Sequence, residues 1–156
     1  PDILLMDEAF SALDPLIRSD MQGILLELQE ELHKTIVFIT HDLSEALRIG
    51  DNIAILRGGA VVQKGSPQEI ILNPADKYVA DFTQDINRGR VLQVGFLMDD
   101  ENATTGPSIE STVVVEDALQ ILSAAGSDVA SVTANSKPIG SIKLKKLIAA
   151  LAKPKR

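Results

Sequence analysis

Two short apolar runs, ILLM at 3–6 and TIVFIT at 35–40, set the framework into which this chain can fold. Both runs are continuous rather than alternating, which favours strands that are buried in a parallel sheet. Between them, apolar residues recur at helical spacing over 17–32, and Asp14 followed by a proline is typical of a helix start. Asp42, with a glutamate three residues later, gives a capping box for a second helix. The order strand, helix, strand, helix predicts an α/β layer with parallel strands.

The rest of the chain divides by its patterns. NIAILR and AVVQK flank a Gly-Gly pair and predict a β-hairpin, after which two short helices complete a unit at 1–85. Residues 86–112 lose hydrophobic periodicity and include an acidic run and the turn-rich NATTGPS, which predicts a linker or a disordered connection. At 113–152 the order is strand, helix, strand, strand, helix, beginning with VVV at 113–115, in a unit too small to bury a good core alone. Residues 153–156 form a basic tail.

Composition limits the cellular compartment and the kinds of cross-link and metal site that we expect. The chain has no cysteine, no visible signal peptide and no apolar run of the roughly 18 residues that a membrane span requires. We therefore expect a cytosolic protein without disulfides or Cys-ligated metals. Its only histidines are His33, which we expect at the surface, and His41. Although the net charge is −7, residues 137–156 hold seven Lys and Arg and no acid, which indicates either contact with an anionic surface or a solvated lysine-covered helix.

Asp7 and Glu8 directly follow the first apolar run. Parallel strands of an α/β sheet end at the edge where ligands bind, and carboxylates there need a cation or hydrogen bonds to balance them. Mg²⁺ prefers oxygen ligands and is commonly shared between a carboxylate and substrate phosphates. We therefore expect Asp7 to face a nucleotide-bound Mg²⁺, and Glu8 to orient or deprotonate an attacking water. A strand that simply exits to solvent gives the same local pattern.

Three motifs together resemble the nucleotide-binding subunit of ATP-binding cassette (ABC) transporters. ILLMDE is similar to the Walker B strand, SALD to the D-loop, and the histidine of THD to the switch histidine. The resemblance implies that Asp7 serves Mg²⁺ and that Glu8 acts on the water. It implies that His41 touches the γ-phosphate and the attacking water. Ser11 and Asp14 would couple two such subunits head to tail.

The similarity extends along the chain. The segment 50–82 resembles the hairpin and helix that close the family's catalytic core. PLIRSDMQGILLELQ and HDLSEALRIGD resemble importers of glycine betaine, proline and related quaternary amines. In those proteins the ATPase carries C-terminal CBS modules, and residues 113–151 resemble one CBS motif. The implied fold is the C-terminal half of a P-loop NTPase domain followed by a small α+β CBS-like unit. ATP and Mg²⁺ are the implied cofactors. The implied partners are a second ATPase subunit and a membrane permease, with no nucleic acid, at the cytoplasmic face of the cell membrane.

The sequence also departs from the family pattern. It contains no GxxxxGK[ST] phosphate loop, no Q-loop and no LSGGQ-like signature, all of which precede Walker B in the family. We therefore expect a fragment of a longer protein that is inactive by itself. In the CBS-like unit, Lys143 and Lys146 occupy places where adenosine-binding members carry hydroxyl and acidic residues. Because a lysine cannot accept a hydrogen bond from ribose, we expect Lys143, Lys145 and Lys146 to meet anionic lipid headgroups and to sense ionic strength.

The resemblance and the departures from it leave three functions open. The first is the energy-coupling ATPase subunit of an importer for glycine betaine or proline-type osmoprotectants. The second is a non-catalytic regulatory protein that keeps the D-loop and the CBS-like unit. The third is the ATPase of another ABC importer, such as one for methionine or polyamines, against which the CBS-like unit argues.

Overall fold

The computed structural model describes residues 2–101 and 105–152. The chain forms two compact units, divided between Ile53 and Ala54. None of the helices in these described ranges combines the length and the apolar character of a membrane span.

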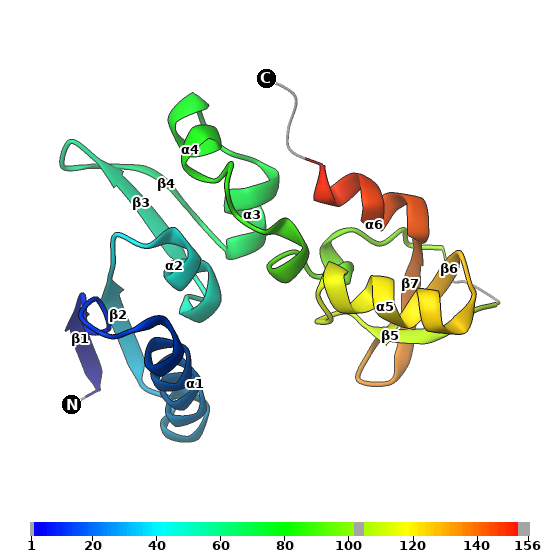
Figure 1. Ribbon diagram of the computed structural model, residues 1–156, viewed down its shortest axis with the longest axis horizontal. Coiled ribbons are helices and arrows are strands. Elements are labelled where there is room, and N and C mark those ends of the chain that lie inside the picture. Colours follow the sequence, from blue (N-terminus) through cyan, green and yellow to red (C-terminus); the bar gives the residue numbers. More distant parts are fainter. Residues whose placement is uncertain (1, 102–104, 153–156) are drawn as a thin grey trace. The chain divides into compact units, whose positions relative to one another are not determined.

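The first unit contains two parallel strands and two helices (Figure 1). β1 (Ile3–Asp7) pairs with β2 (Thr35–Ile39) in a register that places Asp7 opposite Ile39. The connection between them is α1 (Pro15–Leu32), and α2 (Leu43–Ile49) follows β2. The predicted order of strands and helices and the parallel α/β character are confirmed.

Both helices begin where the sequence predicts. The Asp14 carboxylate accepts hydrogen bonds from two backbone N–H groups at the start of α1, and Asp42 does the same for α2. These caps satisfy donors that the first turn of a helix would otherwise leave unpaired. They also fix the loop after β1 and the turn after β2, because each cap ends one of those segments.

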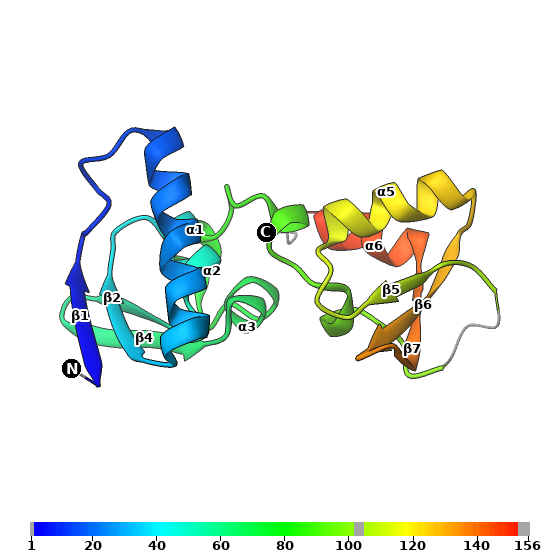
Figure 2. The same cartoon turned by 90° about the horizontal axis from the view of Figure 1, so that it is seen from below.

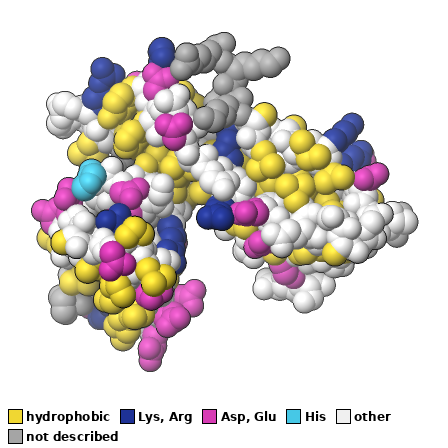
Figure 3. Space-filling view, in the orientation of Figure 1, with side chains coloured by type: hydrophobic (Ala, Val, Ile, Leu, Met, Phe, Trp, Pro, Cys, Tyr) yellow, Lys and Arg dark blue, Asp and Glu magenta, His cyan; other side chains and the backbone are white. Residues whose placement is uncertain are grey.

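The burial of β1 differs from the prediction. Its side chains are mostly exposed, Leu5 by 74%, and apolar residues of α1 such as Leu28 are also exposed. Figure 3 shows hydrophobic side chains on the surface of this unit. The small core of this unit consists of Phe10, Leu43, Leu47 and Ile53. The expectation that both strands are buried is wrong for the residues described, because β2 contains no buried residue either. The physical reason is that a two-stranded sheet with its helices has too few layers to cover both faces.

The predicted hairpin begins at the last residue of the first unit and otherwise belongs to the second. β3 (Ile53–Arg57) and β4 (Ala60–Gly65) are joined by Gly58 and Gly59, both with positive φ, as a tight hairpin turn requires. α3 (Pro67–Leu72) starts with a capping box, and α4 (Lys77–Phe82) follows it.

The remainder of this unit is a three-stranded sheet with two helices. β5 (Ser108–Glu110) runs parallel to β6 (Val129–Ala134), and β6 runs antiparallel to β7 (Lys137–Lys143). α5 (Val115–Ala125) and α6 (Leu144–Leu151) lie on the same side of this sheet (Figure 2). The core is fully buried and consists of Ile109, Leu122, Val132, Ile142 and Leu147, among others.

The predicted strand at 113–115 is wrong. The strand lies at Ser108–Glu110 instead, and Val115 is the buried first residue of α5. Two acids, Glu116 and Asp117, stand in the first turn of α5, where they favour a helix start. This local signal prevails over the strand preference of the valines.

Within the predicted linker 86–112, the described residues carry regular structure. They contain two 3-10 helices, η1 (Arg88–Arg90) and η2 (Val94–Phe96), as well as β5. Leu92 and Val94 are fully buried. Isolated bridges join Gln93 to Val114 and Asp99 to Ser141. This segment is therefore packed against its neighbours over most of its described length.

Candidate functional site

The carboxyl ends of β1 and β2 bring the predicted residues together. Because the strands are parallel and Asp7 is opposite Ile39, the residues that follow each strand emerge at one edge of the sheet. The backbone N–H of Glu8 donates to the carbonyl of Ile39 at 2.9 Å, which extends the pairing by one step. Glu8 and His41 therefore leave the sheet side by side.

Glu8 and His41 are in direct contact. Oε1 of Glu8 lies 2.9 Å from Nδ1 of His41, and the two side chains are 46% and 74% exposed, respectively. The hydrogen bond to Glu8 and the charge of that carboxylate raise the pKa of His41 above its ordinary value of 6.5; Asp42 and Glu45 act in the same direction. The pair is thus a carboxylate within hydrogen-bonding distance of an imidazole at an accessible edge, which is a chemistry suited to moving a proton from water.

The backbone of Glu8 is unusual. Its φ is +44°, in the left-handed region that residues other than glycine rarely adopt. Such conformations persist where the surrounding structure enforces them, and they concentrate at functional sites. Here the turn at Glu8 directs the chain away from β1 and leaves the carboxylate facing His41.

Asp7 is exposed at the end of β1, and its carboxylate has no hydrogen bond or ion pair with other described residues. Nor do the described residues include a group of three His, Cys, Asp or Glu side chains that could enclose a metal ion. Mg²⁺ in nucleotide sites is commonly held by one or two carboxylates together with phosphates. A single free carboxylate at a sheet edge fits that ion when a nucleotide accompanies it.

The loop from Glu8 to Asp14 is held by its own hydrogen bonds. The hydroxyl and the backbone N–H of Ser11 both donate to the carbonyl of Glu8, at 2.9 and 3.1 Å. The Asp14 carboxylate accepts from Leu16 and Ile17 at 3.1 Å. Both predicted D-loop side chains therefore have local structural partners in this chain.

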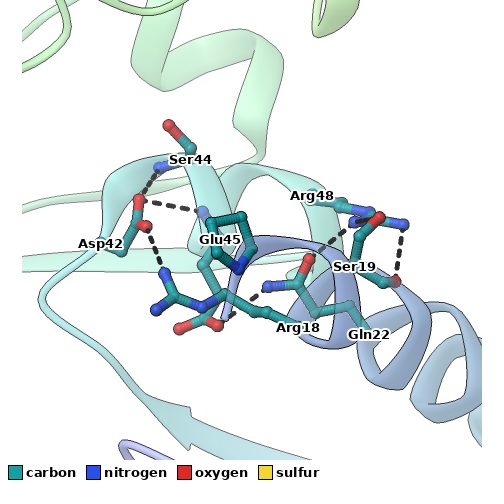
Figure 4. Close-up of a pocket in the computed structure, with 8 residues that line it drawn as sticks. Arg18, Ser19, Gln22, Asp42, Ser44, Glu45 and Arg48 are labelled. Atoms are coloured by element: carbon teal, nitrogen blue, oxygen red, sulfur yellow. Dashed lines mark hydrogen bonds and ion pairs between the residues drawn. The ribbon is translucent and has the colours of Figure 1, made fainter. Parts of the chain in front are cut away.

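Sequence reasoning missed a polar network that joins α1 to α2 (Figure 4). Gln22 and Glu45 are buried and hydrogen-bonded to each other at 2.9 Å, and Arg48 donates to Gln22 at 2.8 Å. Arg18 reaches from α1 to the residue after His41. The apolar pattern of α1 gave no signal for this network, because apolar residues such as Leu28 stay exposed while the polar Gln22 is buried against α2.

The three lysines predicted to sense an anionic surface lie in the second unit. Lys143 and Lys145 are exposed. Lys146 forms an ion pair with Asp99 at 2.5 Å and lies 3.5 Å from the carbonyl of Met98. The hydrogen bond from Lys146 lowers the pKa of Asp99. Among the described residues, Lys143 and Lys145 form no ion pair, although the charge of Lys143 also lowers the pKa of Asp99, whereas Lys146 is engaged within the fold.

Comparisons with known proteins identify several relatives of this chain. No protein-family model matches the sequence. The glycine betaine/carnitine transport ATP-binding protein of Listeria monocytogenes is 62% identical over 98 residues, which is 63% of this chain and 25% of that protein. The glycine betaine transport ATP-binding protein of Bacillus subtilis is 59% identical over 98 residues, covering 63% of this chain and 23% of its own length.

A longer match links both units to one relative. The trimethylamine N-oxide transport system ATP-binding protein of Pelagibacter ubique is 43% identical over 150 residues, 95% of this chain and 44% of that protein. Among solved structures, cbiO1 from Clostridium perfringens, part of an ABC transporter complex, is 33% identical; the match covers 54% of this chain and 32% of that one, with a TM-score of 0.43. The chain thus spans less than half the length of each of these proteins.

Proposed function

We propose that this chain, which belongs to the ATP-binding subunits of ABC transporters, carries the residues that act on the attacking water in ATP hydrolysis. The observation that carries the proposal is the 2.9 Å contact between Glu8 and His41 at the carboxyl edge of parallel strands. This is the edge at which α/β proteins bind nucleotides. The sequence identity of about 60% to two glycine betaine transport ATP-binding proteins supports the same role.

The roles divide among three side chains. Glu8 orients the attacking water and accepts its proton, and His41 holds the Glu8 carboxylate in place while its other ring nitrogen remains available to a phosphate oxygen. Asp7 fits Mg²⁺ bound to ATP, and the ion would neutralise charge on the phosphates. Ser11 and Asp14 shape the loop that meets a second ATPase subunit.

The substrate and the partners are inferred from the relatives. We assign the chain to the import of glycine betaine or related quaternary amines, with a membrane permease as partner and a location at the cytoplasmic face of the membrane. Because the phosphate loop is absent from these residues, they would not hydrolyse ATP by themselves. The exposed apolar residues of β1 support this view, since a surface such as that of Leu5 requires cover from another segment.

We further infer that residues 108–152 form a CBS-like regulatory unit. Their order, β5, α5, β6, β7, α6, is the β-α-β-β-α order of the expected motif. The relative that matches 95% of this chain includes this region. Of the three lysines expected to meet anionic lipid headgroups, Lys143 and Lys145 are exposed, and each would contribute about 1 kcal/mol near such a surface.

The proposal predicts that Glu8→Gln separates binding from hydrolysis. In the intact protein, the variant should bind ATP as the wild type does, because the amide keeps the size of the side chain. Its hydrolysis rate should fall by about 100-fold or more, because an amide cannot accept the proton of water. Nucleotide binding and phosphate release in a single turnover measure the two quantities.

Glu30→Gln is the matched control. Glu30 is an exposed carboxylate on α1, and the same change there should leave both quantities unaltered. Hydrolysis at the wild-type rate by Glu8→Gln would remove Glu8 from its assigned role.

A further inference from the structure

We propose that Arg18 is a positioning residue that holds the loop carrying Glu8 and the turn carrying His41 at a fixed separation. The inference rests on the proposed function of the Glu8–His41 pair and identifies what keeps the two side chains in contact. Arg18 itself touches neither of them. It acts through the backbone on one side and through Asp42 on the other.

On one side, Arg18 binds the loop that follows Glu8. Nη2 of Arg18 donates to the carbonyl oxygens of Ser11 at 3.3 Å and Leu13 at 3.1 Å. Ser11 in turn donates twice to the carbonyl of Glu8. A chain of hydrogen bonds therefore leads from the guanidinium to the backbone of Glu8, whose left-handed conformation needs such enforcement.

On the other side, Arg18 binds the residue that follows His41. Nη1 of Arg18 lies 3.6 Å from Oδ2 of Asp42, while Oδ1 of the same carboxylate caps α2 (Figure 4). The planar guanidinium presents several donors in a rigid fork, so one side chain can bind the carbonyls of a loop and a carboxylate at the same time. The turn at 41–42 is thus tied both to α2 and to α1.

The burial of Arg18 supports a specific role. Its side chain is 30% exposed, and its Nε is a buried donor without an acceptor among the described residues. Buried donors are rarely left unpaired in folded proteins. We therefore infer that the contacts of its two Nη groups offset the cost of the unpaired Nε.

The neighbouring cavity does not offer an alternative explanation. It has a volume of about 220 Å³ and is lined by Arg18, Arg48, Asp42 and Glu45, among others. Two guanidinium groups face two carboxylates there, so the charges balance and an anion gains no net attraction. The polar groups serve the packing of α1 against α2.

Arg48 provides a matched control. It also joins the two helices through a guanidinium, donating to Ser19 at 2.9 Å and to Gln22 at 2.8 Å. Among the described residues, its hydrogen bonds go to Ser19 and Gln22, and none goes to the loop at 8–14 or to Asp42. Replacing Arg48 by alanine removes a comparable interhelical link without releasing either segment that positions the pair.

The test measures the pKa of the His41 imidazole by NMR in the intact protein, with the resonance assigned from His41→Ala. Glu8, Asp42 and Glu45 are the acids that raise this pKa. Loss of a nearby cation would by itself raise an imidazole pKa further. If Arg18 holds Glu8 against His41, Arg18→Ala should instead lower the pKa toward 6.5, while Arg48→Ala leaves it unchanged. An unchanged or higher pKa in Arg18→Ala overturns the proposal.

Kinetics give a second readout. Arg18→Ala should lower kcat by about 10-fold to 100-fold, because a small misplacement of catalytic groups suffices for such a loss, with the KM for ATP nearly unchanged. Arg18→Lys should restore part of the rate, because a single ammonium can hold only one of the two segments. This variant also keeps the test valid where the alanine variant does not fold. Equal losses in Arg18→Ala and Arg48→Ala overturn the proposal. Because the NMR measurement needs no turnover, it tests the role of Arg18 independently of the proposed ATPase activity.

Discussion

Glu8 combines three properties that rarely coincide in one residue. It directly follows a parallel strand, its φ is positive, and its carboxylate lies against an imidazole from the adjacent strand end. The structure enforces this arrangement through the hydrogen bonds of Ser11 and the pairing to Ile39. At the residue scale, the candidate site is therefore a carboxylate held in a conformation that the free chain would seldom adopt.

The Glu8–His41 contact should make stability depend on pH. Because the pKa of His41 is higher in the folded protein than its ordinary value of 6.5, the stabilisation is fully present below pH 6.5 and is lost as the pH rises through the folded pKa. Glu8→Gln should therefore destabilise the protein more at pH 6 than at pH 8. Urea unfolding at the two pH values measures the difference.

The control uses the partner residue. In a His41→Asn background, Glu8→Gln should have the same effect at both pH values, because no imidazole titrates there. A destabilisation by Glu8→Gln that is equal at pH 6 and pH 8 in the wild-type background would contradict the ion pair.

At the scale of elements, α3 is joined to the segment before β5 by one buried side chain. Gln68 is 5% exposed; its amide donates to the carbonyl of Val91 at 2.8 Å and accepts from the N–H of Gln93 at 3.0 Å. This amide replaces the partners that a strand would otherwise supply to those backbone groups. It explains why a segment without periodicity is nevertheless packed.

Gln68→Ala should destabilise the second unit by about 2–4 kcal/mol, because it removes a buried amide and leaves a part-buried N–H and a part-buried carbonyl without these partners. Thermal or urea unfolding measures the change. Gln63 is the matched control, since its amide makes the same two kinds of bond, to Asn73 and Ala75, at exposed sites. Water can replace those partners, so Gln63→Ala should cost about 1 kcal/mol or less. Equal losses at both positions would contradict the role assigned to Gln68.

At the scale of the whole molecule, the sequence predicted what depends on local pattern. The strands, helices and caps of 1–85 follow from periodicity and capping residues, and the meeting of Glu8 with His41 follows from parallel strand order. The exposure of β1 could not be predicted, because burial depends on which layers pack on a strand. The η1 and η2 turns and the links made by Gln68 and Arg18 were missed because contacts between distant residues leave no periodic signal.

The two units differ in how far they bury their apolar residues. The second unit contains most of the fully buried side chains, including Leu92, Leu122 and Leu147, whereas the first leaves β1 and much of α1 exposed. The candidate site thus lies in the unit that is less complete by itself. A test of the whole account must therefore be made in the intact protein.

The most direct test is a double-mutant cycle on ATP hydrolysis with Glu8→Gln and His41→Ala. Residues that act as one catalytic unit show strongly non-additive losses. The account predicts that the double variant hydrolyses ATP at nearly the rate of Glu8→Gln alone. If the two losses multiply instead, Glu8 and His41 act independently, and the contact between them is not the basis of the activity.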